Sequence, residues 1–243
     1  MKIRSIKAGV REVFMDDDKS VLKLERELAV ARSKESAAFA EYTSSWQDDQ
    51  RDQAFSARTE VCVAERKLAA ARGEPYAIPA EFPIRWSMGA PMPFVMSDGY
   101  RTFLTFYVDV PDPEWDGTST TVITPSSPDT YTLCAVTIDQ CVLHRFGAPD
   151  EDILYADGHP LSGKGLEPYT AQVIVDSPWL VEYRAMQGEA DQDGHDVSYG
   201  LKHFAFWFHD NSFECLAQAI HGEVTRESMR SLLERLSRTL FRD

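Results

Sequence analysis

LKHFAFWFHDNSFECLAQ, residues 201–218, is the stretch that decides the fold, because it has the pattern of one β-hairpin. Side chains alternate between the two faces of a strand. With Asp210-Asn211 as a two-residue turn, one predicted face is apolar and belongs in a core, and the other is mostly polar. The apolar face consists of Phe204, Phe206, Phe208, Phe213, Cys215 and Ala217. The polar face carries His203, Trp207, His209, Ser212, Glu214 and Gln218.

The pairing that this turn implies gathers titratable groups on the polar face. It places Trp207 opposite Glu214 and His203 opposite Gln218. His203 and His209 are roughly 20 Å apart at about 3.3 Å per residue along a strand. They cannot share one metal ion, and we predict no metal site. The polar face is still the best candidate site in the chain.

If the protein is an enzyme, its acid–base chemistry is expected at the turn end of this face, because histidine and carboxylate groups within hydrogen-bonding reach act as general acids and bases. The candidate catalytic residues are His209, Glu214 and His159. The candidate ligand-binding residues are Lys164, Trp207 and His203. This alternative requires His159 and Lys164, from a glycine-rich loop, to lie over the polar face. Turn formation and ordinary packing would explain the same residues without catalysis.

Two further motifs resemble ligand-binding loops but are incomplete. Residues 158–165, GHPLSGKG, nearly match the phosphate-binding loop GxxxxGK[ST], but Gly165 replaces the hydroxyl residue that binds magnesium and Pro168 interrupts the helix that should follow. Residues 189–196 and 112–117 carry oxygen-bearing side chains at alternate positions, as calcium loops do, but lack the closing glutamate. A glycine-rich surface loop and solvated acidic turns are the simpler interpretations, and no cofactor is predicted.

The acidity of the chain is confined to its middle part. The net charge is −14. Residues 1–72 hold 14 basic and 13 acidic residues, residues 73–220 hold 6 and 22, and residues 221–243 hold 5 and 4. The negative electrostatic potential of residues 73–220 repels phosphate backbones, so nucleic-acid binding is disfavoured. It suits a protein partner with a basic surface, although solubility alone would also explain it.

The composition is that of an ordinary globular protein, with 43% hydrophobic and 26% charged residues. No apolar run is long enough to span a bilayer, and the N-terminus lacks the apolar stretch of a signal peptide. The four cysteines are scattered with no CxxC pair, which favours reduced structural thiols. We therefore expect a cytoplasmic protein that does not associate with membranes.

Residues 17–73 predict a coiled-coil-like helical hairpin after a separate N-terminal segment, residues 1–16. No glycine or proline interrupts residues 19–72. Apolar residues follow a three–four spacing: Val21, Leu24, Leu28, Ala31, Ala38 and Tyr42, then Ala54, Ala57, Val61, Ala64, Leu68 and Ala71. The phase breaks between the two sets, so two antiparallel helices are expected, with Ser44 or Ser45 as N-cap and Gly73 at the end. The stripe is thin, so the hairpin should pack on the main domain, a second copy or a partner.

Residues 76–243 predict an acidic α+β domain. Strands are expected at 100–110, 120–124, 131–138, 141–146 and 169–175, besides the hairpin. Ser177 is expected to cap a helix from Pro178 to about Gln187 rather than act as a nucleophile. An amphipathic helix from Glu223 to Phe241 closes the chain, with Met229, Leu232, Leu233, Leu236 and Leu240 inward. The predicted fold class is α+β, with a mainly antiparallel sheet and packed helices after the N-terminal helical hairpin.

No complete catalytic motif is present, so the expected function is a non-enzymatic interaction module of the immunity-protein or adaptor kind. It would use the acidic domain, the helical hairpin or both to bind a protein with a basic surface, or would self-associate through the hairpin. The alternative is a hydrolase-like or ligand-binding enzyme with its His/Glu site on the 201–218 hairpin. A calcium-stabilised structural protein is a third hypothesis.

Overall fold

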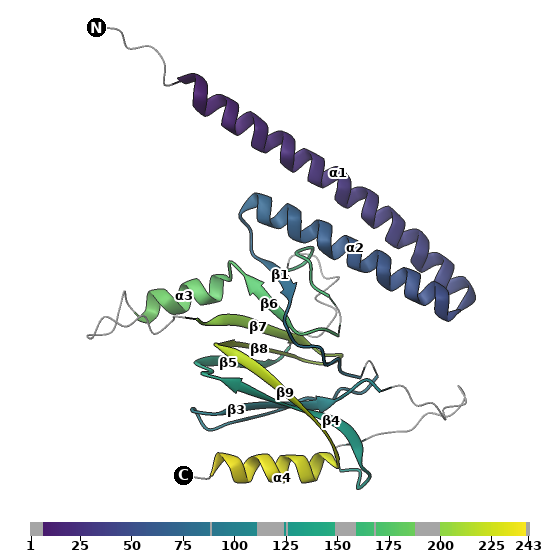
Figure 1. Ribbon diagram of the computed structural model, residues 1–243, viewed down its shortest axis with the longest axis vertical. Helices are drawn as coiled ribbons and strands as arrows, with labels where there is room; N and C mark the ends of the chain where they lie inside the picture. Colours follow the sequence, from purple (N-terminus) through teal and green to yellow (C-terminus); the bar gives the residue numbers. More distant parts are fainter. Residues whose placement is uncertain are drawn as a thin grey trace. The chain divides into compact units, whose positions relative to one another are not determined.

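The computed structural model describes residues 7–87, 89–110, 124, 126–148, 159–167, 169–187 and 200–241 (Figure 1). The chain forms two compact units. The first consists of residues 1–77 and 160–166, and the second of residues 78–159 and 167–243. The fold class is α+β, as predicted: a helix pair is followed by two antiparallel sheets with short helices.

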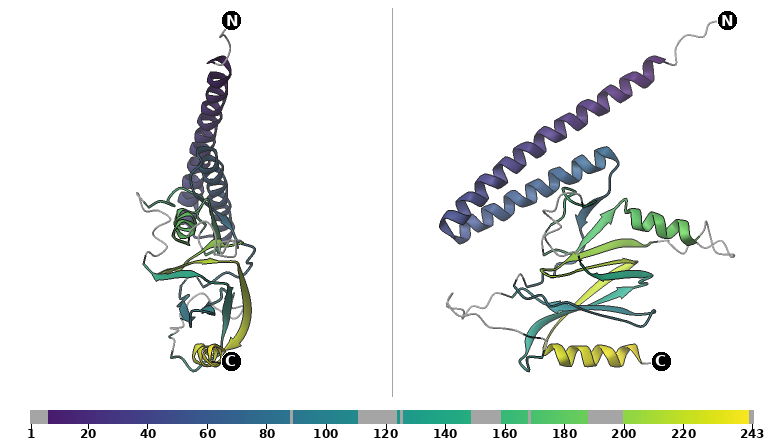
Figure 2. Two further views of the ribbon diagram at one scale, coloured as in Figure 1. Left: turned by 90° about the vertical axis from the view of Figure 1, so that its left-hand side faces the viewer. Right: turned by 180° about the vertical axis from the view of Figure 1, so that it is seen from behind.

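Two antiparallel helices, α1 (Lys7–Ser45) and α2 (Asp48–Arg72), build the first unit. The predicted apolar stripes form their seam, in which Leu28, Ala31, Val61 and Leu68 are buried, while Ala71 is exposed. Helix α1 begins at Lys7, inside residues 1–16, which were predicted to form a separate N-terminal segment. An ion pair of 2.6 Å between Arg72 and Glu25 marks where α2 ends beside α1. The first part of α1 therefore extends past α2, as both views in Figure 2 show.

The two ends of α2 differ in how well the sequence predicted them. The N-cap is Gln47, which makes no side-chain capping bond, so the predicted serine cap is wrong. The Ser44 hydroxyl instead donates back to the Glu41 carbonyl at 2.7 Å, as serine does when a helix continues past it. At the other end Gly73 has a φ of 65°, and its N–H donates to Ala70. That is the predicted glycine stop.

Two antiparallel sheets form the second unit, whose first strand straddles the boundary between the units. The first sheet has the order β1 (Tyr76–Pro79), β6 (Gln172–Val175), β7 (Lys202–Trp207), β8 (Ser212–Ala217) and β5 (Leu143–Gly147). The second sheet has the order β2 (Phe94–Ser97), β3 (Thr102–Tyr107), β4 (Tyr131–Asp139) and β9 (Ala219–Glu227). Strands β1 and β2 were not expected from the sequence.

The main core lies between the inner faces of these sheets. The phenylalanine face of the 201–218 hairpin lies in it, as predicted, against side chains of β3 and β4 such as Leu104, Phe106 and Val136. Trp86 joins this core, and its indole N–H donates to the Trp207 carbonyl at 3.1 Å. Burial of so many aromatic side chains is the dominant stabilising contribution in this unit.

A helix packs on the outer face of each sheet, so the second unit has four layers (Figure 1). Helix α3 (Pro178–Gln187) contributes Tyr183 to a cluster with Leu201 and Leu216 of the first sheet. Helix α4 (Met229–Leu240) covers the second sheet with its leucine face, as predicted. Each sheet is thus covered on its inner face by the other sheet and on its outer face by a helix.

The register of the 201–218 hairpin differs from the predicted one by two residues. His203 lies opposite Leu216, Ala205 opposite Glu214, and Trp207 opposite Ser212. The strands are joined through residues 208–211, and the Phe208 N–H donates to the Asn211 carbonyl at 2.7 Å. The turn is therefore centred on His209-Asp210, one residue before the predicted Asp210-Asn211. Both faces are nevertheless correct, because an even shift keeps every side chain on its own face.

The predicted helix from Glu223 begins too early. Residues 219–227 form β9, which pairs with β4 along its whole length, and α4 starts only after the Ser228 N-cap, whose hydroxyl accepts from the Ser231 N–H at 3.2 Å. The β-branched pair Val224-Thr225 favours a strand. The strand predicted at 120–124 lies outside the described residues except for Thr124.

Candidate functional site

A buried chain of polar side chains runs across the outer face of the first sheet. The Ser177 hydroxyl lies 2.8 Å from His203 Nδ1, and His203 Nε2 lies 2.9 Å from Glu214 Oε2. Arg145 Nε donates to the other Glu214 oxygen at 2.7 Å. Ser177, His203 and Glu214 are only 3%, 3% and 1% exposed. These four residues are the buried relay.

The two-residue register shift is what assembles the relay. Glu214 pairs with Ala205, so His203 is its diagonal neighbour on the same face of the sheet, within reach of a long side chain. Arg145 pairs directly with Glu214 from β5 on the other side of β8. Ser177 comes from the turn before α3, where its hydroxyl also accepts from the Leu180 N–H at 3.2 Å. It is the predicted helix cap.

Electrostatics favour the charged form of Glu214. Burial is the largest influence and opposes ionisation, but the hydrogen bonds from His203 and Arg145 and the charge of Arg145 outweigh it, so the pKa of Glu214 is lowered. The Arg145 side chain is itself 58% exposed. Its positive charge therefore remains hydrated while its fork reaches a buried carboxylate.

A tryptophan covers the histidine of the relay. Trp179 meets the His203 ring edge to face, with 5.2 Å between ring centroids. The Arg145 guanidinium carbon lies 4.9 Å from the centroid of the Trp179 ring, which is a cation–π contact. Trp179 therefore links the exposed end of the relay to its buried end and shields His203 from solvent.

The hydrogen bonds of the relay are satisfied when His203 carries its proton on Nε2. That proton is donated to Glu214, Nδ1 accepts the Ser177 hydroxyl proton, and the serine oxygen accepts the Leu180 N–H. The order Ser–His–Glu is that of a hydrolytic triad. However, a nucleophilic serine must be reachable by substrate, and Ser177 is buried and occupied as a cap. The geometry suits a structural tie between α3, β7, β8 and β5.

The predicted site residues of the hairpin only partly come together. His159 and Trp207 form an edge-to-face contact with 6.3 Å between ring centroids. Partial burial is the main reason why the pKa of His159 is lowered; Arg145 lowers it further and Glu214 opposes the shift. Glu214 lies within the ladder and bonds to His203, while His209 is exposed in the turn. The structure therefore pairs Glu214 with His203, a residue that the sequence assigned to ligand binding rather than to acid–base chemistry.

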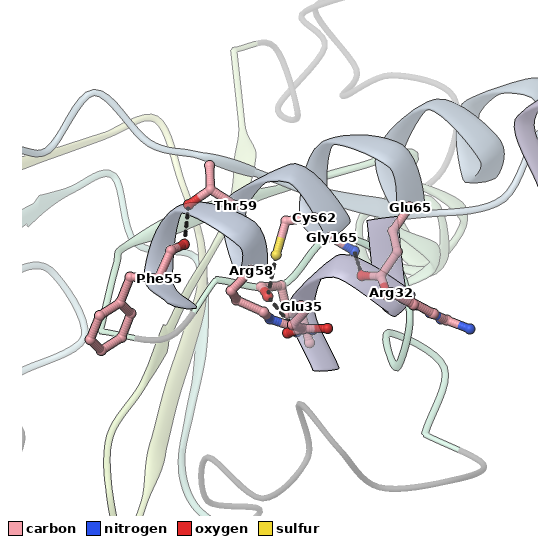
Figure 3. A network of polar contacts seen from close by, with 9 residues as sticks. Arg32, Glu35, Phe55, Arg58, Thr59, Cys62, Glu65 and Gly165 are labelled. Atoms are coloured by element: carbon pink, nitrogen blue, oxygen red, sulfur yellow. Dashed lines mark hydrogen bonds and ion pairs between the residues drawn. The ribbon is translucent and has the colours of Figure 1, made fainter. Parts of the chain in front are cut away.

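Lys164 belongs to the first unit, where its ammonium pairs with Glu74. The glycine-rich loop around it is held against α2 by a second buried carboxylate, Glu65, which is shown in Figure 3. Glu65 accepts from the Gly165 N–H at 3.1 Å and from Arg32 Nη2 at 3.1 Å. The Gly165 carbonyl in turn accepts from Arg66 Nη2 at 2.8 Å.

This geometry does not support a phosphate-binding loop at residues 160–165. Gly165 has a φ of +80°, and a Cβ there would lie 2.4 Å from Arg66 Cγ, so glycine is required for close approach to α2 rather than to a nucleotide. Its N–H is already bonded to Glu65, and the next described element is strand β6. The Leu166 carbonyl accepts from Cys62 Sγ at 3.3 Å. The loop is a structural arm of the helical hairpin.

The two calcium-like segments lie outside the described residues. Within the described part of the chain, no group of three or more His, Cys, Asp or Glu side chains has the arrangement of a metal site. No helix among these residues is long and apolar enough to cross a bilayer.

The helical hairpin presents apolar side chains that the first unit leaves uncovered. Phe39 and Trp46 lie near the turn between the helices and are 57% and 72% exposed. Tyr42 stacks edge to face between them, with ring centroids 6.3 Å from Phe39 and 5.3 Å from Trp46. Leu22, Val30, Phe55 and Val63 are exposed along the same helices. We call Phe39, Tyr42, Trp46 and Phe55 the tip cluster. Tyr42 belongs to the predicted apolar stripe of α1, whereas Phe39, Trp46 and Phe55 lie off the predicted stripes.

The chain matches no protein-family model, and comparison with curated proteins and with solved structures gives no significant match.

Proposed function

We propose that the protein is a non-enzymatic, cytoplasmic interaction module whose helical hairpin is the element that binds another protein. The observation that carries this proposal is the set of exposed large apolar side chains on α1 and α2, above all Phe39 and Trp46. Aromatic side chains are enriched in protein interfaces because they bury a large area at little cost in conformational entropy.

The shape of the hairpin adds support. The beginning of α1 extends past the end of α2 (Figure 2), and a helix without a neighbour is only marginally stable in water. A partner that covers both the overhanging helix and the tip cluster would stabilise it. The acidic charge of residues 73–220 would favour a partner with a basic surface elsewhere.

The hydrolase alternative has weaker support. Its acid–base groups would be His209, Glu214 and His159, but the described partners of Glu214 are His203 and Arg145, both of which hold it as a buried anion. Two cavities among the described residues, one on α1 and α2 and one on α4, are lined by no residue of the relay. A substrate pocket beside the relay would be needed for catalysis.

The test is recovery of a stoichiometric partner by the full-length chain from its native host. A tip variant carrying Phe39→Ser, Trp46→Ser and Phe55→Ser should lose that partner while keeping its fold. The matched control replaces three exposed apolar residues of the second unit, Tyr100→Ser, Val181→Ser and Met186→Ser, and should retain it. Absence of any partner for the unaltered chain, together with a monomer in solution, would refute the proposal.

A further inference from the structure

A groove of about 420 Å³ runs along one side of the helical hairpin, between α1 and α2. Its floor consists of Val30, Ala31, Val63 and Ala64. Val30 is 60% exposed, although it lies directly beside the buried seam. The groove is therefore an apolar strip that the hairpin forms but does not fill.

The lining residues recur at helical spacing on both helices. On α1 the lining runs from residue 23 to residue 34, and on α2 from residue 60 to residue 67. The α1 part is about 17 Å long at 1.5 Å per residue, or three helical turns. Two helices side by side with open apolar positions between them form the holes into which the side chains of a third helix insert.

The charged residues that line the groove determine which kind of partner helix it can bind. Two cations of the lining are neutralised within the hairpin: Lys34 pairs with Glu60 at 3.1 Å, and Lys23 with Glu27 at 3.8 Å. Arg26 and Lys67 also line the groove, one on each helix. Neither makes an ion pair with a described side chain. The groove thus carries two unmatched positive charges in a chain whose net charge is −14.

We infer that this groove binds an acidic amphipathic helix of a partner protein, an assignment that rests on the proposed interaction function and specifies its chemistry. Leucine-type side chains on one face of the helix fill the Val30/Val63 strip, and flanking carboxylates pair with Arg26 and Lys67. A second copy of this hairpin is the poorer occupant, because it would bring the same unmatched cations to the interface.

The experiment uses the full chain and a labelled helical peptide of about three heptads, with leucine at the two core positions of each heptad and glutamate beside them. A second peptide has lysine in place of every glutamate. Fluorescence anisotropy should detect saturable binding of the glutamate peptide, weakening as salt is raised, and at least about tenfold weaker binding of the lysine peptide.

Two double variants locate the site. Arg26→Glu with Lys67→Glu should weaken binding of the glutamate peptide at least about tenfold and improve binding of the lysine peptide. Arg85→Glu with Arg230→Glu changes the net charge equally at exposed residues of the second unit, and should leave the affinity unchanged. Circular dichroism checks that helix content is retained, as expected because glutamate is a good helix former.

Equal binding of the two peptides, or equal effects of the two double variants, would overturn the inference. So would a dimer of the unaltered chain in sedimentation that Arg26→Glu with Lys67→Glu dissociates, because the occupant would then be a second copy. If the groove variant keeps the native partner and the tip variant loses it, the groove assignment fails while the proposed function stands. If the unaltered chain has no partner at all, the proposed function itself fails.

Discussion

Removal of the Glu214 carboxylate by Glu214→Ala should destabilise the second unit by about 3 kcal/mol. The carboxylate is almost fully buried and accepts hydrogen bonds from His203 and Arg145. Without it, the His203 Nε2–H loses its acceptor in a place that water does not reach. The Arg145 side chain is more than half exposed, so its guanidinium regains most of its hydration.

The size of this destabilisation follows from the difference in burial between His203 and Arg145. Removal of one partner from a buried charged pair typically costs about 3–5 kcal/mol, and the exposure of Arg145 places Glu214→Ala at the low end. For a unit of this size, about 3 kcal/mol lowers the melting temperature by roughly 6–12 °C. Glu214→Gln keeps the shape and one acceptor, so its cost should be about 1 kcal/mol.

Urea unfolding followed by tryptophan fluorescence measures this directly. Trp46 is the one tryptophan of the first unit, so a Trp46→Phe background makes the signal report the second unit alone. Glu182→Ala removes an exposed glutamate of α3 and is the control, with an expected change below about 0.5 kcal/mol. If Glu214→Ala costs no more than Glu182→Ala, the relay does not stabilise the fold and the reasoning is wrong.

Four further outcomes are expected. The pKa of Glu214 is lowered from its usual 4.5. Its stabilising contribution is therefore complete above pH 4.5 and is lost as the pH falls through the lower pKa of the folded state. Acid unfolding curves of the unaltered chain should show this loss, and those of Glu214→Gln should lack it. The Cys141 thiol, whose pKa is lowered to about 6 chiefly by a hydrogen bond from Cys215, should be alkylated by iodoacetamide with a half-maximal rate near that pH. Cys134, whose pKa burial raises to about 12, should stay unmodified in the same mass-spectrometric assay. Gly165→Ala should lower the stability of the first unit by at least about 1 kcal/mol because residue 165 has a positive φ, and helix melting in circular dichroism measures this. Ser177→Ala should lower the stability of the second unit by about 1 kcal/mol because the helix cap is lost, and urea unfolding measures this.

Among the described residues, each unit contains one buried carboxylate, and the two serve the same structural purpose. Glu65 in the first unit and Glu214 in the second are both almost fully buried. Each is held by an arginine whose own side chain is more than half exposed, Arg32 and Arg145 respectively. An arginine at the surface can reach inward with its fork while its charge remains solvated. In both places a buried carboxylate ties together segments that are distant in the sequence.

Local rules predicted the helical hairpin well. A long stretch free of glycine and proline, with two apolar stripes out of phase, defines two helices whatever surrounds them. Gly73 followed by Pro75 ends the second helix for reasons of backbone geometry alone. The serine cap failed because Ser44 and Ser45 bond back to the Glu41 carbonyl within α1, an option that local sequence does not distinguish from capping.

The candidate site was predicted less well, and the reason is register. Alternation assigned Glu214 and His203 to the same face correctly, since that depends only on whether a residue is odd or even along the strand. Their pairing depends on where the turn is centred, and a centre at His209-Asp210 instead of Asp210-Asn211 moves Glu214 from Trp207 to Ala205, diagonally beside His203. A turn centred one residue earlier, at His209-Asp210, is the alternative that would have suggested this pairing.

The sequence by itself therefore determined the fold class, the two helices of the hairpin, the core face of the 201–218 segment and the cap at Ser177, because each follows from periodicity or from the conformational preference of a single residue. Which polar groups meet depends on the tertiary structure. Arg145, Ser177 and His203 reach Glu214 from separate elements, and Gly165 reaches Glu65 from a residue 100 positions away. Such contacts depend on how strands are paired and how a loop returns to a helix, and these depend on the packing of the whole unit rather than on any local segment.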